Sequence, residues 1–212
     1  MAHVLRLPSA VPRRGFTLVE MLVVIGILVV LIGLLFPTIS KIQSEAQSTN
    51  CMNNMRQIHG AIESYRQLHN SLLPNTEPLP AVTEAGPIGG LPGILKSYLP
   101  RESSAWLCPS DTDPESYETG TSYLYLPGLY VLLPQTQLQL PPNVLELKPR
   151  ERAELEARIV TALYEGADGI GIPVLIDSQD RHFIGDRVPR NALYIDGGVR
   201  IAQKSPPQQA AN

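Results

Sequence analysis

The chain has 212 residues, of which 17% are charged and 43% are hydrophobic, and its formal net charge is −3. This is a globular rather than a disordered composition, and the length suits one domain or one domain with an appendage. The acidic balance, without a basic cluster, argues against nucleic acid as a general partner. The 20 prolines and 16 glycines favour a loop-rich second half with short strands over a helical bundle.

The first predicted element is an apolar helix over residues 16–36. Apart from Thr17, Glu20 and two glycines, all its side chains are large and apolar. A helix of this length spans roughly 30 Å, the thickness of the hydrocarbon core of a bilayer. Glu20 is its single ionisable residue, and a charge at that depth is costly enough that it usually has a partner or a function.

Basic residues precede this helix. Arg13 and Arg14 stand directly before it and no comparable pair follows, which predicts a cytoplasmic N-terminus with everything after Pro37 outside. An ordinary secretory signal is the weaker alternative, because the apolar run is too long and no A-x-A-like cleavage site follows it.

The stretch RRGFTLVEMLVVIGILVVL resembles the N-terminus of type IV prepilins and type II secretion pseudopilins. In that family a membrane peptidase cuts after the glycine and N-methylates the new terminal residue. The resemblance implies a leader peptide over residues 1–15, cleavage between Gly15 and Phe16, and methylation of Phe16. It also implies that residues 16–37 form a transmembrane assembly helix, in which Glu20 pairs with the N-terminal amine of a neighbouring subunit.

An amphipathic helix over residues 38–70 is expected to continue this rod. Pro37 stands where pilins often carry a helix-weakening proline, and it invites a kink. Beyond it, apolar residues at spacings of 4, 3, 4 and 3 form one face of a helical period. These residues are Cys51, Met55, Ile58, Ile62 and Tyr65. The stripe needs a domain to cover it.

The head is expected over residues 71–205, followed by a disordered tail at 206–212. Its first part, residues 71–120, is rich in proline and glycine and reads as loop. Short strands are predicted at residues 122–126, 129–133, 172–177 and 191–196, and a helix at 150–164. A closing hairpin is predicted around the Asp196-Gly197 turn. The fold class is therefore α+β and pilin-like, with a long N-terminal helix packed on a small antiparallel sheet.

The two cysteines, Cys51 and Cys108, leave two readings open: one disulfide in an exported domain, or two buried thiols. The segments CMNNMRQI and CPSD also resemble recurrent segments of a pseudopilin-like group, and this resemblance favours the disulfide. Asp111 and Asp113 have the spacing that begins a calcium loop, but the glycine and closing glutamate of that loop are missing. A solvated acidic turn is therefore preferred to an irregular calcium site, and no other cofactor is expected.

The C-terminal region resembles a prepilin-type signature in which a histidine is followed after nine residues by Asp-Gly. His182 and Asn191 to Gly197 match its two ends, including Asp196. The spacing from His182 to Asp196 is thirteen residues, so the role of His182 stays open.

The sequence contains no nucleophile elbow, P-loop, HExxH or CxxC motif, and no enzymatic activity is expected. The leading expectation is a structural subunit of a type II secretion pseudopilus or a type IV pilus-like filament. Its expected partners are the prepilin peptidase, other pilin or pseudopilin subunits and an inner-membrane platform. Before assembly it would be a single-pass inner-membrane protein with a periplasmic head. The alternatives are a minor tip subunit that binds a secreted substrate or a surface ligand, and an anchored protein that never polymerises.

Overall fold

The computed structural model describes residues 16–132, 147–166, 171–179 and 190–202. The predicted leader with Gly15, the tail and His182 lie outside the described residues. The chain divides into two compact units, residues 1–41 and 42–212, which are considered separately.

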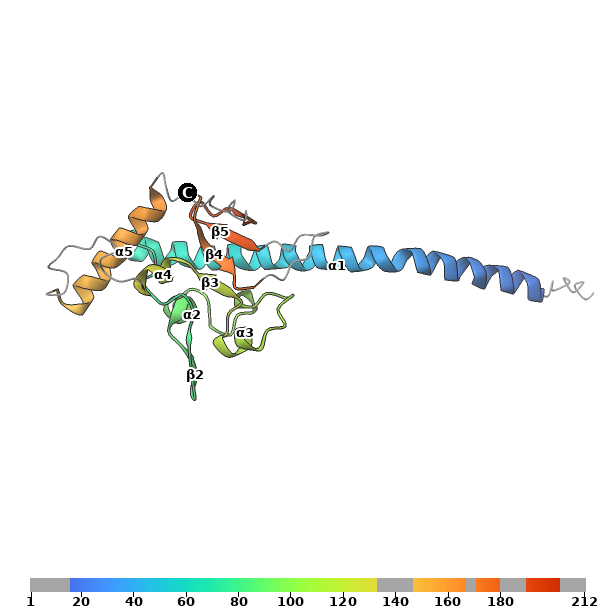
Figure 1. Ribbon diagram of the computed structural model, residues 1–212, viewed down its shortest axis with the longest axis horizontal. Coiled ribbons are helices and arrows are strands. Elements are labelled where there is room, and N and C mark those ends of the chain that lie inside the picture. The colour runs from blue at the N-terminus through green and yellow to red at the C-terminus, as the bar shows by residue number, and fades with distance from the viewer. Residues whose placement is uncertain (1–15, 133–146, 167–170, 180–189, 203–212) are drawn as a thin grey trace, which may run out of the picture. The chain divides into compact units, whose positions relative to one another are not determined.

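A single long helix, α1, runs from Leu18 to Leu68 and contributes to both units (Figure 1). Its backbone is assigned as helical through position 37, so the proline does not end the helix. The helix ends where Asn70 and Ser71 adopt positive φ angles of 53° and 61°. The amide of Ser71 donates to the carbonyl of Arg66 at 2.9 Å, which satisfies one of the carbonyls left over at a helix end.

The second unit contains a four-stranded sheet of order β3-β4-β5-β6, antiparallel throughout. Its strands are β3 (Tyr123–Tyr125), β4 (Pro173–Asp177), β5 (Asn191–Tyr194) and β6 (Val199–Ile201). Three of the four predicted strands are therefore confirmed, with shorter bounds. The closing hairpin is also confirmed, and the amide of Tyr194 donates to the carbonyl of Gly198 at 3.0 Å beside the turn.

The core of the second unit forms where the outer part of α1 meets this sheet. Cys51, Met55, Ile58 and Ile62 are at most 2% exposed, so the predicted apolar stripe is the buried face of the helix. They belong to one cluster with buried sheet residues such as Tyr125, Leu175 and Leu193 and with the single tryptophan, Trp106. In Figure 1, β4 and β5 run beside the cyan part of α1.

Residues 71–120 are more structured than the predicted loop. They form the β1–β2 hairpin, α2, two 3₁₀ turns and α3. The bounds are Ala81–Thr83 (β1), Gly86–Ile88 (β2), Gly90–Ile94 (α2), Leu95–Ser97 and Ser104–Trp106 (3₁₀) and Pro114–Thr119 (α3). A local hydrogen bond helps to order this segment: the buried Trp106 donates its indole N–H to the carbonyl of Pro100 at 2.9 Å.

The strand predicted over residues 129–133 is wrong. Residues Pro127–Leu132 form helix α4 instead. Proline suits the first turn of a helix, and a Cβ on Gly128 would lie 2.5 Å from the backbone nitrogen of Pro78, a contact that leaves no room for a side chain. Tyr130 then packs edge to face on Tyr164 of α5, with ring centroids 6.2 Å apart. Helix α5 spans Pro149–Glu165, close to the predicted bounds.

Candidate functional site

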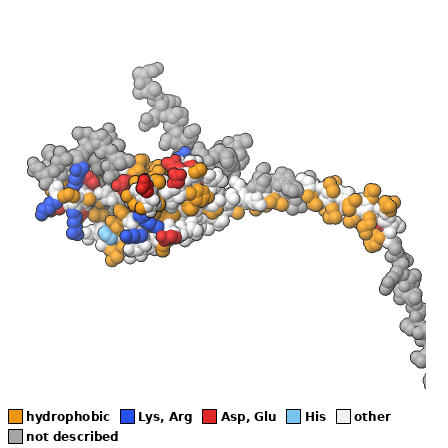
Figure 2. Space-filling model, turned by 90° about the horizontal axis from the view of Figure 1, so that it is seen from below, with side chains coloured by type: hydrophobic (Ala, Val, Ile, Leu, Met, Phe, Trp, Pro, Cys, Tyr) orange, Lys and Arg blue, Asp and Glu red, His pale blue; other side chains and the backbone are white. Residues whose placement is uncertain are grey.

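The described part of the first unit is an apolar helix whose side chains make little contact within the chain. Every large apolar side chain from Phe16 to Ile32 is between 47% and 81% exposed. Figure 2 shows these side chains along the N-terminal part of α1. Apolar residues lie all around the helix, a pattern that belongs to buried helices rather than to a solvated surface. Within the part of the chain that the structure describes, no helix qualifies by length and hydropathy as a membrane span.

Glu20 is the one carboxylate in this segment, and the structure gives it partners in its own chain. Its Oε2 accepts hydrogen bonds from the backbone N–H and the hydroxyl of Thr17, both at 2.8 Å. In return, the Glu20 N–H donates to the Thr17 hydroxyl at 3.3 Å. This reciprocal pattern is a capping box that satisfies amide groups otherwise unpaired at the start of α1.

The contact of Thr17 with Glu20 was not predicted from the sequence. The sequence contains the pattern that predicts this contact, because Thr17-Leu18-Val19-Glu20 before an apolar run has the form of a capping box. Phe16, the predicted processing position, directly precedes this pair and its side chain is 75% exposed. The candidate assembly site therefore consists of Phe16, Thr17 and Glu20. The side chain of Pro37 lies outside the described residues.

The second unit is cross-linked by the Cys51–Cys108 disulfide, with Cα atoms 5.1 Å apart. The disulfide predicted through the family resemblance is therefore present, and the reading as two buried thiols is wrong. Both residues are at most 2% exposed, so the bond lies in the core between α1 and the segment that precedes α3.

Asp111 and Asp113 bind the chain's own donors. The carboxylate of buried Asp111 accepts from the hydroxyl of Ser122 and, at 2.9 Å, from the amide of Asp113. Asp113 caps α3 by accepting from the amide of Glu115 at 3.2 Å, and its other oxygen accepts from Gln179. No group of three or more metal-binding side chains occurs among the described residues. These contacts make both carboxylates turn and cap residues, and the irregular calcium site, which was the less favoured alternative, is not tested.

Within the C-terminal signature, Asn191 joins three elements. Its backbone N–H donates to Oδ2 of Asp177 on β4 at 2.8 Å, and its carboxamide lies 3.4–3.5 Å from the hydroxyl of Ser48 on α1. All three residues are at most 3% exposed. Buried polar groups are usually hydrogen-bonded, and this asparagine thus links β5 to β4 by a short bond and to α1 by longer contacts.

The Asp196-Gly197 turn packs against the same helix. Gly197 has a φ of 77°, and a Cβ there would lie 2.7 Å from Nε2 of His59. Asp196 accepts from the amide of Gly198 at 2.8 Å and so stabilises the turn. The signature residues Asn191, Asp196 and Gly197 thus have structural roles, whereas His182 lies outside the described residues.

An α+β domain joined to an exposed apolar helix with a capped N-terminus is consistent with the pilin-like fold. Residues 12–36 match the family model described as the prokaryotic N-terminal methylation motif. No curated protein and no solved structure matches the chain. The matched segment contains Gly15, Phe16, Thr17 and Glu20, and it confirms the prepilin-type signal. The motif implies processing by a prepilin peptidase and assembly with other pilin-type subunits.

Proposed function

We propose that this chain is a structural, non-catalytic subunit of a type II secretion pseudopilus or a type IV pilus-like filament. It is cleaved after Gly15, methylated on Phe16 and assembled through α1. The observation that carries this proposal is the methylation motif at residues 12–36, which overlaps a helix whose apolar side chains from Phe16 to Ile32 are largely exposed among the described residues.

The exposed apolar segment needs an environment that removes it from water. Burial of apolar surface is worth about 25 cal/mol per Å², so a segment exposed on all sides strongly favours lipid or neighbouring helices. In our proposal it lies in the inner membrane before assembly and among the same segments of other subunits afterwards. Since lipid is as apolar as these side chains, close packing and polar pairs must drive the transfer into the filament.

The disulfide and the arginines support the proposed orientation. Disulfides persist in oxidising compartments, which supports a periplasmic location for the second unit and its Cys51–Cys108 bond. Arg13 and Arg14 precede the apolar segment and favour a cytoplasmic N-terminus. Both observations support a single-pass protein with its head outside the cytoplasm.

Glu20 is proposed to change partners during assembly. In the single chain its carboxylate is bound by Thr17. In the filament it pairs with the Phe16 amine of a neighbouring subunit, which neutralises both charges and sets the axial register. The Thr17 bonds leave Oε1 of the carboxylate for this second partner, because both of them end on Oε2.

Two measurements test the proposal. Mass spectrometry of the assembled protein should show N-methylated Phe16 as its first residue, and an intact leader in filaments would refute the proposal. Glu20→Ala should be cleaved normally but should lose at least tenfold in filament yield. Glu45→Ala, which removes an exposed carboxylate elsewhere on α1, is the matched control and should assemble normally.

Copy number separates the proposed role from that of a tip subunit. A building block should be present in proportion to filament length, as measured by quantitative mass spectrometry of purified filaments. A constant few copies per filament would indicate a tip subunit.

A further inference from the structure

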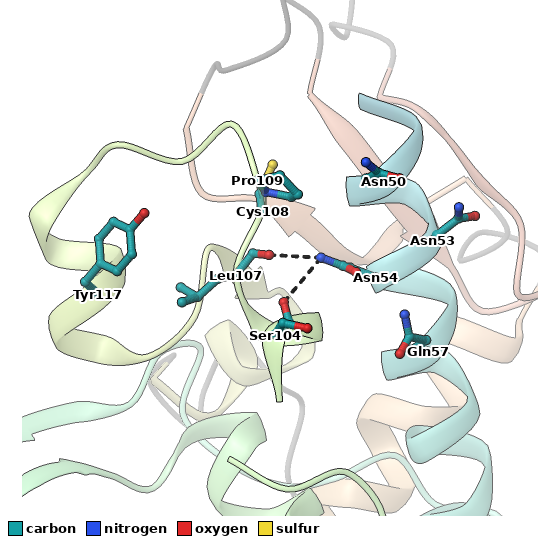
Figure 3. Close-up of a pocket in the computed structure, with 9 residues that line it drawn as sticks. All are labelled: Asn50, Asn53, Asn54, Gln57, Ser104, Leu107, Cys108, Pro109 and Tyr117. Carbon is teal, nitrogen blue, oxygen red and sulfur yellow. Dashed lines mark hydrogen bonds between the residues drawn. The ribbon is translucent and has the colours of Figure 1, made fainter. Parts of the chain in front are cut away.

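An open hollow of about 560 Å³ on the second unit is lined by α1, by the segment 104–109 and by Tyr117 of α3, with the segment between the other two (Figure 3). Four carboxamides line its α1 side: Asn50, Asn53, Asn54 and Gln57. Its volume falls within the range of small-molecule sites, about 300–1,000 Å³. Filament assembly through the first unit gives this hollow no role.

The lining excludes several classes of ligand. Among the described residues that line the hollow, none is Lys, Arg, His, Asp or Glu. A metal ion of the calcium or magnesium type would need carboxylates, and a phosphorylated ligand would need cationic donors. The nearby Arg56 directs its guanidinium to Oδ1 of Asn53 at 2.6 Å. The lining is mixed, since Leu107, Pro109 and Tyr117 stand beside the carboxamides, and a purely apolar ligand would leave those carboxamides without partners. What remains is a neutral ligand that forms many hydrogen bonds.

The four carboxamides divide into one that supports the wall and others that face solvent. Asn54 donates to the carbonyls of Leu107 and Ser104 at 2.9 and 3.4 Å, and it thereby holds the segment 104–109 against α1. Asn50 and Gln57 are exposed, and their side chains have no hydrogen bond to any other described residue. They lie seven positions apart, about two helical turns, on one face of α1. Each offers two donors and one acceptor.

An aromatic ring stands on the other side of the segment 104–109. Tyr117 of α3 is 58% exposed, and its hydroxyl donates to the carbonyl of Asp111 at 2.9 Å. The bond fixes the ring, so that its faces rather than its hydroxyl are available to a ligand. The Cys51–Cys108 disulfide ties α1 to this segment. The backbone around the hollow is therefore held in place before binding, and the main ordering cost is that of the Asn50 and Gln57 side chains.

We propose that this hollow binds a short stretch of a neutral glycan. Sugar hydroxyls both donate and accept hydrogen bonds and thus match the carboxamides of Asn50 and Gln57, while the C–H face of a sugar ring stacks on Tyr117. A peptide that binds by strand addition fits less well, since it needs a strand edge. The α1 wall offers no such edge, because its backbone groups are paired within the helix. This binding is independent of filament assembly.

The test uses the full chain in a detergent without a sugar headgroup, titrated by calorimetry with cellohexaose, chitohexaose and maltohexaose. At least one hexasaccharide should bind. Asn50→Ala and Gln57→Ala should each weaken that binding about threefold to tenfold, the usual range for one hydrogen-bonding group. Tyr117→Ala should also weaken it, whereas Tyr117→Phe should retain it because the ring remains.

Gln67→Ala is the matched control, since it removes an exposed carboxamide from the same helix outside the hollow, and it should bind as the unchanged chain does. Near-ultraviolet circular dichroism would show that each variant keeps its fold. The proposal is overturned if none of the three hexasaccharides binds, or if binding survives Gln57→Ala and Tyr117→Ala unchanged. Displacement of a bound hexasaccharide by an extended Gly-Ser peptide would also overturn it, in favour of a peptide site.

Discussion

Glu20 and Thr17 form a closed hydrogen-bonded pair at the start of α1, in which one carboxylate oxygen accepts both the amide and the hydroxyl of the threonine at 2.8 Å. The charge that stands alone in the apolar segment is therefore satisfied by its own chain. If Glu20 pairs with a neighbour's amine as proposed above, this contact holds the carboxylate in the single subunit before assembly. It also shows what the Thr17 side chain does in the folded subunit: its hydroxyl caps the start of α1.

The first prediction concerns this pair. Thr17→Val keeps the shape of the side chain but removes the hydroxyl that binds Glu20, so the first turn of α1 should open more often. Hydrogen exchange at the Glu20 amide, resolved by mass spectrometry with fragmentation in detergent, should become several-fold faster. Thr17→Ser retains the hydroxyl and should exchange at the original rate. Equal rates in Thr17→Val and the unchanged chain would show that the hydroxyl does not cap the helix.

Periodic features of the fold could be predicted from the sequence. The buried face of α1 follows from the spacing of Cys51, Met55, Ile58 and Ile62, because a helix must repeat every 3.6 residues. The β5–β6 hairpin follows from the Asp-Gly turn. At the N-terminus, an apolar run after two arginines and a glycine is specific enough to predict the methylation motif over residues 12–36.

Features that depend on tertiary contact could not be predicted in this way. The segment LYVLL has strand-like side chains, but Pro127 and the close contact of Gly128 with Pro78 favour helix α4. The turns around Trp106 depend on a bond to the carbonyl of Pro100 that no spacing reveals. Likewise, the bond between Asn191 and Asp177 becomes visible only when β4 and β5 pair.

The second prediction concerns the disulfide. Cys51–Cys108 closes a loop over a separation of 57 residues, and removal of such a cross-link from a small domain costs about 2–4 kcal/mol of unfolding free energy. The double variant Cys51→Ser/Cys108→Ser should therefore unfold at a clearly lower guanidinium concentration. A phosphine reductant should lower the midpoint of the unchanged chain and leave that of the double variant unaffected. Equal midpoints with and without reductant in the unchanged chain would contradict this account.

The third prediction concerns the turn of the C-terminal signature. Gly197→Ala places a side chain at a φ of 77° and within 2.7 Å of His59 Nε2. The backbone conformation alone should cost about 1–2 kcal/mol of unfolding free energy, and the contact should add to it. The matched control is Gly171→Ala, since no atom of the described residues lies within 4 Å of its Cβ position.

The contributions of strain and contact can be separated with a second variant. Adding His59→Ala to Gly197→Ala should restore only part of the loss, as measured by chemical unfolding and a double-mutant cycle. Full restoration of the unfolding free energy would mean that the contact with His59 causes the whole destabilisation. An unchanged unfolding free energy in Gly197→Ala would contradict the turn seen in the structure.

The fourth prediction concerns two buried tyrosines that differ in their hydrogen bonds. Tyr125 donates its hydroxyl to the carbonyl of Pro74 at 2.9 Å, whereas the hydroxyl of Tyr164 has no partner among the described residues. Tyr125→Phe should therefore cost about 1 kcal/mol of unfolding free energy at pH 7, because a buried carbonyl loses its donor. Tyr164→Phe should be neutral or slightly stabilising, because it removes a buried polar group that no protein bond offsets.

The same pair predicts the behaviour of the chain at alkaline pH. Burial raises the pKa of both phenols, that of Tyr125 most strongly. In the unfolded chain a tyrosine loses its proton near pH 10, so at higher pH the unfolded state binds fewer protons than the folded state. The stability from these neutral phenols is therefore complete below about pH 10 and falls as the pH rises further.

Urea unfolding at pH 8 to 11 should show this fall in unfolding free energy in the unchanged chain and a smaller fall in Tyr164→Phe. If Tyr164→Phe loses as much stability as the unchanged chain over this range, the phenol of Tyr164 does not contribute to the alkaline transition.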